Sequence, residues 1–235
     1  MSATHFRAVL TSNNQFKVRT DILESGKLAV RRPEELHLQL LLKRCIDLVG
    51  AIVLLILLSP IFILTGLFVY CGDGAPILYR RRVVRVVGEF DAFKFRTMRR
   101  DADSILASNH ALQAEYQRNF KLVNDPRVTK LGVFLRKFSI DELPQLFNVL
   151  FGQMSLVGPR MITAPELEKY GAYSRLLLSV RPGLTGYWQV CGRQNVSYRD
   201  RVRMDVEYLQ NWSLGMDLAI LLRTPLTVLR MEGAF

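Results

Sequence analysis

The chain has 235 residues, of which 49% are hydrophobic and 23% are charged, so it can build one or two packed domains and is neither a disordered tail nor a stapled mini-protein. Lys and Arg outnumber Asp and Glu by 32 to 21, which gives a formal net charge of +11. A balance this basic indicates phosphate-bearing partners: nucleic acid, anionic lipid or phosphorylated substrates. The three cysteines, Cys45, Cys71 and Cys191, are widely spaced and odd in number, which argues against a disulfide framework and predicts reduced thiols facing the cytosol.

The N-terminal part of the chain changes abruptly from polar to apolar. Residues 1–40 are polar and weakly patterned, and we expect them to form a loosely packed arm. From Leu48 to Val69 there are 22 consecutive residues without a charge. A membrane-spanning helix needs about 20 apolar residues, so this segment is long enough to cross a bilayer core. Because a polar stretch precedes it, we expect it to stay in the mature protein and not to be a cleaved signal peptide.

Ser59 and Pro60 stand at the midpoint of this apolar segment and predict a break, because proline removes a backbone donor and clashes with the preceding helical turn. Basic residues flank both ends: residues 43–44 are Lys-Arg, and three consecutive arginines begin at Arg80. The positive-inside rule would place both flanks in the cytoplasm, which one spanning helix cannot satisfy. We therefore expect a re-entrant helix–break–helix hairpin over residues 41–72. A single kinked transmembrane helix is the alternative.

The remainder, residues 73–235, is expected to form one small domain without internal repeats. Residues 76–100 hold eight Lys or Arg against two acidic residues, a net +6 beside the membrane segment. This charge fits a surface lying on anionic headgroups, at about 1 kcal/mol per basic residue, and equally a pocket for phosphates. Short strands at 77–79 and 90–95 predict a β-hairpin. Helical patterns cover 101–120, 141–151, 165–180, 197–212 and 214–230, so the predicted fold class is α+β and helix-dominated.

The last predicted helix carries an amphipathic stripe. Its apolar positions recur at spacings of three and four, and the proline among them should bend it. They are Leu218, Leu221, Leu222, Pro225, Val228 and Leu229. Such a stripe packs in a core or lies in a membrane interface, and we favour the core.

Residues 139–144, Ser-Ile-Asp-Glu-Leu-Pro, have a composition that packing alone does not require. One interpretation is a capping box, with Ser139 as the cap and Glu142 reaching back to it. Pro144 would then fall at the fifth helical position, where its missing N–H belongs in the helix, so a start nearer Asp141 accommodates it better. Two adjacent carboxylates at a helix N-terminus can supply a nucleophile and a ligand for a hard divalent cation.

Three further segments combine glycine or aromatic residues with cations. Gly158 and Pro159 form a turn that presents Arg160, and residues 181–193 hold three glycines between two arginines. Glycine lets backbone approach a ligand closely, and arginine grips phosphate with two parallel hydrogen bonds. Together with the Lys-Phe-Arg-Thr-Met run at 94–98, these segments supply several cations for one anionic substrate. A GxxxxGK[ST] phosphate loop is absent from the sequence, which disfavours ordinary ATP or GTP hydrolysis.

In this order and spacing, the motifs resemble those of the bacterial sugar transferases, also called monotopic phosphoglycosyl transferases or polyprenyl-phosphate hexose-1-phosphate transferases. The resemblance runs from about residue 40 to the C-terminus. It rests on Lys43-Arg44 with Asp47, the apolar run with Ser59-Pro60, Lys94-Phe95-Arg96-Thr97-Met98, Asp125-Pro126-Arg127-Val128-Thr129, Leu135-Arg136, Leu143-Pro144-Gln145-Leu146 around Asp141-Glu142, Gly158-Pro159-Arg160, and Arg181-Pro182-Gly183 onward.

The resemblance implies a two-step transfer at the cytoplasmic face of the bacterial inner membrane. Asp141 would attack the β-phosphate of a UDP-sugar, releasing UMP and forming an aspartyl phosphosugar, and undecaprenyl phosphate would then take the sugar phosphate. Glu142, with Asp141, would hold Mg²⁺, with Mn²⁺ as an alternative. The further site residues implied are Lys94, Arg136, Arg160, Asp217, Arg181 and Arg193. Residues 73–235 would then be a cytoplasmic catalytic domain with amphipathic interfacial helices, and the product would begin an exopolysaccharide or other surface polysaccharide.

The sequence departs from the family pattern at three places. The turn from Arg82 to Gly88 is one residue short, which puts the predicted β-hairpin in doubt. Met161 stands where a second proline commonly follows Gly-Pro-Arg, so the rigidity of that loop is in question. Gln153 replaces a common acidic residue.

Two rival functions remain open at this stage. One is a non-catalytic membrane-bound scaffold of a polysaccharide assembly complex, in which the basic face binds lipid or a protein partner. The other is nucleic-acid binding, which we disfavour because the sequence has no aromatic-basic RNA signature or zinc-finger spacing. For the enzyme, galactose and glucose are the favoured hexoses, and the choice between monomer and homodimer is open.

Overall fold

A computed structural model describes residues 33–85, 88–119, 122, 125–191 and 196–229 of the chain. All of these residues lie in one compact unit of the chain. Most of the described structure is helical, and its strands form two small sheets. The predicted helix-dominated α+β class is confirmed.

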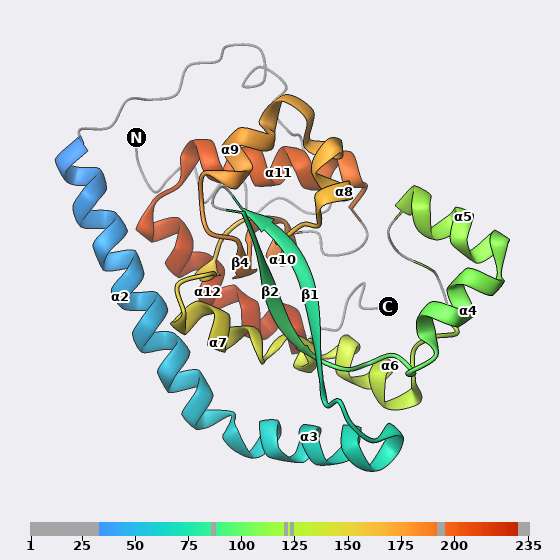
Figure 1. Cartoon of the computed structure of the whole chain (residues 1–235). Coiled ribbons are helices and arrows are strands. Elements are labelled where there is room, and N and C mark those ends of the chain that lie inside the picture. The colour runs from blue at the N-terminus through green and yellow to red at the C-terminus, as the bar shows by residue number, and fades with distance from the viewer. Residues whose placement is uncertain (1–32, 86–87, 120–121, 123–124, 192–195, 230–235) are drawn as a thin grey trace. The chain divides into compact units, whose positions relative to one another are not determined.

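The apolar segment forms two helices that meet at an angle. Helix α2 spans Pro33–Leu57 and α3 spans Ser59–Asp73, and the pair is bent by 62° where they join (Figure 1). The predicted break at Ser59 and Pro60 is confirmed: proline opens α3, where its missing N–H costs nothing, and the Ser59 hydroxyl donates to the Ile56 carbonyl at 2.8 Å. In the described part of the chain, none of the helices alone has the length and apolar composition to cross a membrane. The two helices of this bent pair meet both requirements when taken together.

Helix α2 begins earlier than the polar composition suggested. Its first residue is Pro33, so residues 33–40, which we assigned to the arm, are helical. Proline is favoured in the first turn of a helix because its fixed backbone angle is already helical there. Two glutamates follow it in sequence, and negative charge near a helix N-terminus is stabilised by the helix dipole.

Most apolar side chains of the two helices face outward. Exposed large apolar residues on α2 and α3 are Leu38, Leu40, Leu41, Leu42, Val49, Ile52, Val53, Ile56, Leu57, Ile61, Ile63, Leu64, Leu67, Phe68 and Tyr70. A contiguous exposed apolar surface of this kind marks a region that lipid or another protein covers.

A polar face of α2 fastens this helix to the rest of the fold. Asp47 is buried, and its Oδ1 accepts hydrogen bonds from Ser155 Oγ and the Leu156 backbone N–H, both at 2.9 Å. Lys43 donates to the Val157 carbonyl at 2.9 Å. One turn of α2 therefore holds the short strand β3, Ser155–Val157, at three consecutive residues.

The far end of α3 is held by an arginine from the neighbouring sheet. Arg96 Nη2 donates to the carbonyls of Asp73 and Gly74, each at 2.8 Å, and lies 3.1 Å from Asp73 Oδ2. These bonds satisfy carbonyls that the end of a helix leaves without partners. Both helices of the bent pair are thus tied to the domain by charged side chains.

The predicted β-hairpin is present and longer than expected. Strands β1, Leu78–Arg85, and β2, Gly88–Phe95, pair antiparallel along eight residues from Leu78 opposite Phe95 to Arg85 opposite Gly88. The shortened turn does not disrupt this register, although residues 86–87 lie outside the described part. Arg82 reinforces the pairing through contacts at 3.1 Å with Glu89 and 3.0 Å with Asp91.

The remaining elements follow the predicted helical stretches with several interruptions. The stretch 101–120 divides at Asn109, and 141–151 becomes one 3-10 turn and a short helix. The elements are α4 (Ala102–Ser108), α5 (His110–Asn119), α6 (Lys130–Lys137), η2 (Ile140–Glu142), α7 (Gln145–Leu150), α8 (Ala164–Leu167), η3 (Glu168–Tyr173), α9 (Ser174–Leu178), α10 (Tyr187–Cys191), α11 (Tyr198–Asn211) and α12 (Leu214–Leu229). The sequence analysis missed a parallel pair formed by β3 and β4, Gly183–Thr185.

Among the described residues, two apolar clusters organise the packing of these elements. One joins Val69 of α3 to Phe95 of β2 and Leu135 of α6. The other packs Ile162 against Tyr170, Leu177, Val202 and Val206, which links the segment after β3 to η3, α9 and α11. The first cluster lies beside the carboxylates described below, because Ile140 also packs against it.

The prediction that the stripe of α12 packs in the core was wrong. Leu218, Leu222 and Leu229 are exposed, with Leu222 at 77% of its full accessibility. The helix instead buries Met216, Asp217 and Ile220, lying against β3 and β4, so its apolar stripe points outward. This stripe has the character of an interfacial helix surface.

We predict that Asp47→Ala destabilises the fold. Removing the carboxylate leaves the Ser155 hydroxyl and the Leu156 N–H buried without an acceptor, which costs about 1–3 kcal/mol for each group. Thermal unfolding in detergent should show a clear drop in Tm. Cys45→Ala, an exposed position two residues away on the same helix, is the matched control and should leave Tm unchanged. Equal melting of both variants would contradict the anchoring role.

Candidate active site

Asp141 and Glu142 lie together in a single 3-10 turn, η2, between α6 and α7. The backbone enters this turn through Ser139, whose φ of 56° is in the left-handed region, and the serine side chain makes no capping hydrogen bond. The capping-box interpretation is therefore wrong, because Glu142 turns to Lys94 and α7 begins only at Gln145, after Pro144. Both carboxylates are largely withdrawn from solvent, with Asp141 only 6% exposed.

Lys94 reaches the carboxylates from strand β2. Its Nζ lies 2.5 Å from Glu142 Oε1 and 3.6 Å from Asp141 Oδ2. The position of the ammonium follows from the strand: Lys94 pairs with Tyr79 across the hairpin, and the next residue, Phe95, is buried in the apolar cluster with α3 and α6. One cation thus bridges both acidic side chains.

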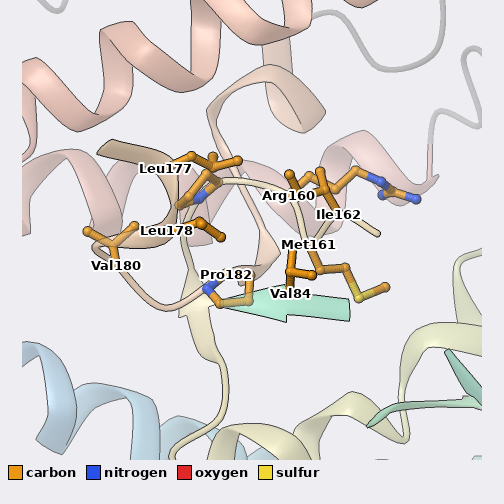
Figure 2. Close-up of a pocket in the computed structure, with 9 residues that line it drawn as sticks. Val84, Arg160, Met161, Ile162, Leu177, Leu178, Val180 and Pro182 are labelled. Carbon is orange, nitrogen blue, oxygen red and sulfur yellow. The ribbon is translucent and has the colours of Figure 1, made fainter. Parts of the chain in front are cut away.

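Arg160 approaches from the other side, on the loop that follows β3. Its Nη2 lies 3.7 Å from Glu142 Oε1, which makes an ion pair but is too long for a hydrogen bond. Gly158 and Gly183 permit this loop, because a side chain on either glycine would collide with the backbone of the other segment. Figure 2 shows that the guanidinium of Arg160 points away from an apolar pocket that backs the same loop.

Met161 does not loosen the loop that carries Arg160. Its side chain is 3% exposed and lines the same apolar pocket, whose other walls include Val84, Ile162 and Pro182 (Figure 2). The backbone is held on both sides of it, because Gly183 N–H donates to the Pro159 carbonyl at 2.8 Å and Val84 N–H to the Ile162 carbonyl at 3.0 Å. Packing and backbone hydrogen bonds therefore restrain this loop in the absence of a second proline.

Arg136 comes from the last turn of α6 and is half-buried, and the charges of Asp141 and Glu142 both act on it. Its Nε donates to Thr97 Oγ1 at 3.0 Å. Burial lowers the pKa of Arg136, while the charges of Asp141 and Asp125 act in the opposite direction. The third cation predicted for the site is therefore near enough for its charge and that of Asp141 to interact. Thr97 holds its guanidinium; this threonine lies in the motif 94–98, but the sequence did not indicate this role for it.

The two carboxylates titrate in opposite directions. Burial raises the pKa of Asp141 above its ordinary value, although the Lys94 ammonium opposes the shift. Burial also acts against the charge of Glu142, but Lys94 and then Arg160 outweigh it and lower the pKa of Glu142 to about 2. Glu142 is the firmly ionised member of the pair, and the anion of Asp141 is the less stabilised and more nucleophilic one.

The structure does not join every predicted site residue to this cluster. Asp217 is buried under α2, where it accepts hydrogen bonds from Lys43 Nζ at 2.7 Å, Tyr208 Oη at 2.8 Å and Trp212 Nε1 at 3.1 Å. Those contacts tie α2, α11 and α12 together. Arg181 is exposed and donates to the Gly152 carbonyl at 2.8 Å. Arg193 lies outside the described residues.

Trp188, which lies in the segment 181–193 singled out in the sequence, and Arg201, which no motif indicated, form an aromatic and basic group next to Arg160. Trp188 of α10 lies with its ring centre 5.6 Å from the Arg160 guanidinium and 5.2 Å from that of Arg201, which belongs to α11. Arg201 stood in a predicted helix whose charges have the appearance of an ordinary solvated face. Only the packing of α10 against α11 brings the three side chains together.

The donor set suits a hard divalent cation. Magnesium binds proteins through one or two carboxylates and takes its other ligands from water and substrate phosphates. Asp141 and Glu142 offer two adjacent carboxylates of this kind, and among the described residues no third His, Cys, Asp or Glu joins them. The residues present therefore fit a metal that is completed by a bound phosphate, with Glu142 as the ionised ligand.

We predict opposite effects on stability when each carboxylate is neutralised. The folded pKa of Asp141 lies above its ordinary 3.8, so ionising Asp141 costs stability at neutral pH, and Asp141→Asn should raise Tm. The folded pKa of Glu142, about 2, lies below its ordinary 4.5. Its stabilisation is present above pH 4.5 and lost as pH falls toward 2, so Glu142→Gln should lower Tm at neutral pH. Thermal unfolding of both variants tests this, and a loss of Tm in both would contradict it.

Comparison with known proteins agrees with the resemblance seen in the motifs. The UDP-galactose-lipid carrier transferase of Erwinia amylovora is 44% identical over 203 residues, which cover 85% of this chain and 43% of that protein. The undecaprenyl-phosphate galactose phosphotransferase of Salmonella typhimurium is 47% identical over 199 residues, covering 83% of this chain and 42% of that protein. The exopolysaccharide production protein ExoY of Sinorhizobium fredii is 46% identical over 198 residues, covering 82% of this chain and 88% of that protein.

The chain therefore spans less than half the length of the first two relatives and most of the third. The model of the family described as bacterial sugar transferase matches residues 38–231, which include most of α2 and every element of the site that follows it. The predicted family is confirmed, and the chain belongs to the bacterial sugar transferases.

Proposed function

We propose that this protein transfers a hexose 1-phosphate from a UDP-sugar to undecaprenyl phosphate and releases UMP. The observation that carries the proposal is the buried pair of Asp141 and Glu142 under Lys94 and Arg160. Relatives named for undecaprenyl-phosphate galactose transfer and for exopolysaccharide production support this reaction class, and galactose is the sugar we favour, with glucose second.

In the first half of the reaction, a carboxylate oxygen of Asp141 attacks the β-phosphorus of the UDP-sugar. The bond between this phosphorus and the oxygen that bridges it to the α-phosphate breaks, and UMP leaves with the bonding pair. The sugar phosphate stays on Asp141 as an acyl phosphate. A carboxylate whose pKa is raised by burial is suited to this attack, because little of its negative charge is stabilised in the resting state.

In the second half, a phosphate oxygen of undecaprenyl phosphate attacks the same phosphorus. The bond to Asp141 breaks, the carboxylate is regenerated, and the sugar joins the lipid through a new diphosphate. Lys94, Arg136 and Arg160 neutralise the charge that develops on the phosphoryl oxygens in both halves. A bound divalent cation, held by Glu142 with Asp141, would polarise the phosphate oxygens as a Lewis acid.

We propose a location on the cytoplasmic face of the bacterial inner membrane: the exposed apolar surfaces support a seat in lipid, and the basic residues on both flanks of the apolar segment favour the cytoplasmic side. We propose that α2 and α3 form a re-entrant hairpin and that the outward stripe of α12 lies in the lipid interface. Lys43, Asp47 and Arg96 would transmit the position of this hairpin to the segments that carry the site. A lipid phosphate reaches the carboxylates there without leaving the membrane surface.

The proposed reaction predicts turnover that depends on both the sugar and the lipid. Purified protein with Mg²⁺, undecaprenyl phosphate and a panel of UDP-sugars should release UMP with one sugar, and release should depend on the lipid. Asp141→Asn should abolish turnover, because the amide cannot act as the nucleophile. Asp200→Asn, a surface carboxylate that caps α11 with Ser197, is the matched control and should remain active. Absence of UMP release with every sugar would contradict the function and favour a non-catalytic scaffold.

The proposed re-entrant hairpin predicts that both of its ends lie on the cytoplasmic side of the membrane. In a variant with Cys45, Cys71 and Cys191 replaced by serine, single cysteines at His37→Cys and Tyr79→Cys lie in exposed positions on either side of the hairpin. A membrane-impermeant maleimide should label neither in intact spheroplasts and both after permeabilisation. Labelling of one site from outside would instead show a spanning helix.

A further inference from the structure

Arg160 is aimed at the carboxylates without being held by them. Its shortest contact there is the 3.7 Å ion pair to Glu142, and its guanidinium makes no hydrogen bond to any other described residue. Its N–H donors are thus free for a phosphate. A long side chain without fixed partners would normally sample many rotamers, and its ordering on substrate binding would weaken affinity.

The indole of Trp188 gives the Arg160 guanidinium the fixed partner that the Glu142 carboxylate does not provide. The Arg160 guanidinium lies 5.6 Å from its ring centre, within the range of a cation–π contact. Trp188 is 6% exposed, so the ring is fixed by packing and cannot follow the arginine. This contact holds the guanidinium over the indole, while its N–H donors make no hydrogen bond to another described residue.

Arg201 is fixed on the same indole from the side of helix α11. Its guanidinium lies 5.2 Å from the centre of Trp188 and 4.3 Å from that of Tyr198. Its Nη2 is 3.8 Å from Glu166 Oε1. The Glu166 carboxylate is itself locked, because Oε2 accepts from Thr163 N–H at 2.9 Å and from Thr163 Oγ1 at 3.0 Å.

We propose that Trp188 and Arg201 are positioning residues for Arg160, so that a chain of contacts from Glu166 through Arg201 and Trp188 sets where Arg160 meets a substrate phosphate. This deepens the proposed function and rests on it for the identity of the phosphate. Arginine is required at position 201 because its planar cation stacks on rings, which a lysine ammonium does not do in the same way.

The test is a double-mutant cycle with Arg160→Gln, Arg201→Gln and the double variant, measured as kcat/KM for UMP release. We expect Arg201→Gln to lower kcat/KM about tenfold, the effect typical of a residue that orients an active-site group. In the Arg160→Gln background the same change should have no further effect, because it acts only through Arg160. Arg203→Gln, on the same helix and paired with Asp200 at its surface, should stay within about twofold of wild type.

Two outcomes would overturn the proposal. One is a loss in the double variant equal to the product of the single losses, which would show independent roles. The other is equal activity of Arg201→Gln and Arg203→Gln. Trp188→Phe with Arg160→Gln gives a second cycle. It leaves Arg201 and Glu166 intact and retains a buried ring. The proposal can therefore still be tested if Arg201→Gln fails to fold.

Binding of UMP separates this inference from the proposed function. The same cycle is repeated on the Kd for UMP by calorimetry, which needs no turnover. Wild type that binds UMP but transfers no sugar refutes the function, while a non-additive cycle in Kd still supports the positioning chain. Wild type that neither binds UMP nor releases it refutes both.

Discussion

The site depends on one electrostatic constraint: two neighbouring carboxylates, Asp141 and Glu142, are buried in a single turn and need cations from outside that turn. Lys94 forms ion pairs with both, Arg160 pairs with Glu142, and the charge of Arg136 acts on Asp141. These three cations come from β2, the loop after β3, and α6. Unless all three segments are in place, the cost of two buried negative charges is not offset. The carboxylate pair therefore dictates how hairpin, helix and loop converge.

The bent helix pair acts on the same segments. Lys43 and Asp47 of α2 bond to β3, whose end leads into the Arg160 loop, and Arg96 binds the end of α3 two residues after Lys94. Helix α3 is thus fastened next to the strand that carries Lys94, and α2 to the strand that leads into the Arg160 loop. This arrangement gives a physical route by which the position of the bent pair fixes the geometry of the cations. It also accounts for the buried charged residues on the inner face of α2, whose outward side chains are mostly apolar.

The sequence predicted the local features well and the long-range contacts poorly. The break at Pro60, the β-hairpin and the carboxylate pair follow from residues adjacent in the chain, where proline sterics, alternation and composition act directly. Asp217 was expected at the site, but its partner is Lys43, a contact between residues 174 apart that no local pattern encodes. The core assignment of α12 failed because an apolar stripe shows which side is apolar and not what covers it. From the sequence alone, Arg201 could not be distinguished from the solvated charged residues of its helix, because its role depends on the packing of α10 against α11.

The central claim is that Asp141 carries the sugar phosphate between donor and lipid. The most direct measurement is mass spectrometry of the intact protein after incubation with Mg²⁺ and the UDP-sugar in the absence of undecaprenyl phosphate, followed by peptide mapping. The account predicts a mass gain of one hexose phosphate on the peptide that contains Asp141, and its loss when undecaprenyl phosphate is added. An unmodified protein that still transfers sugar phosphate to lipid, or an adduct on a different residue, would contradict it.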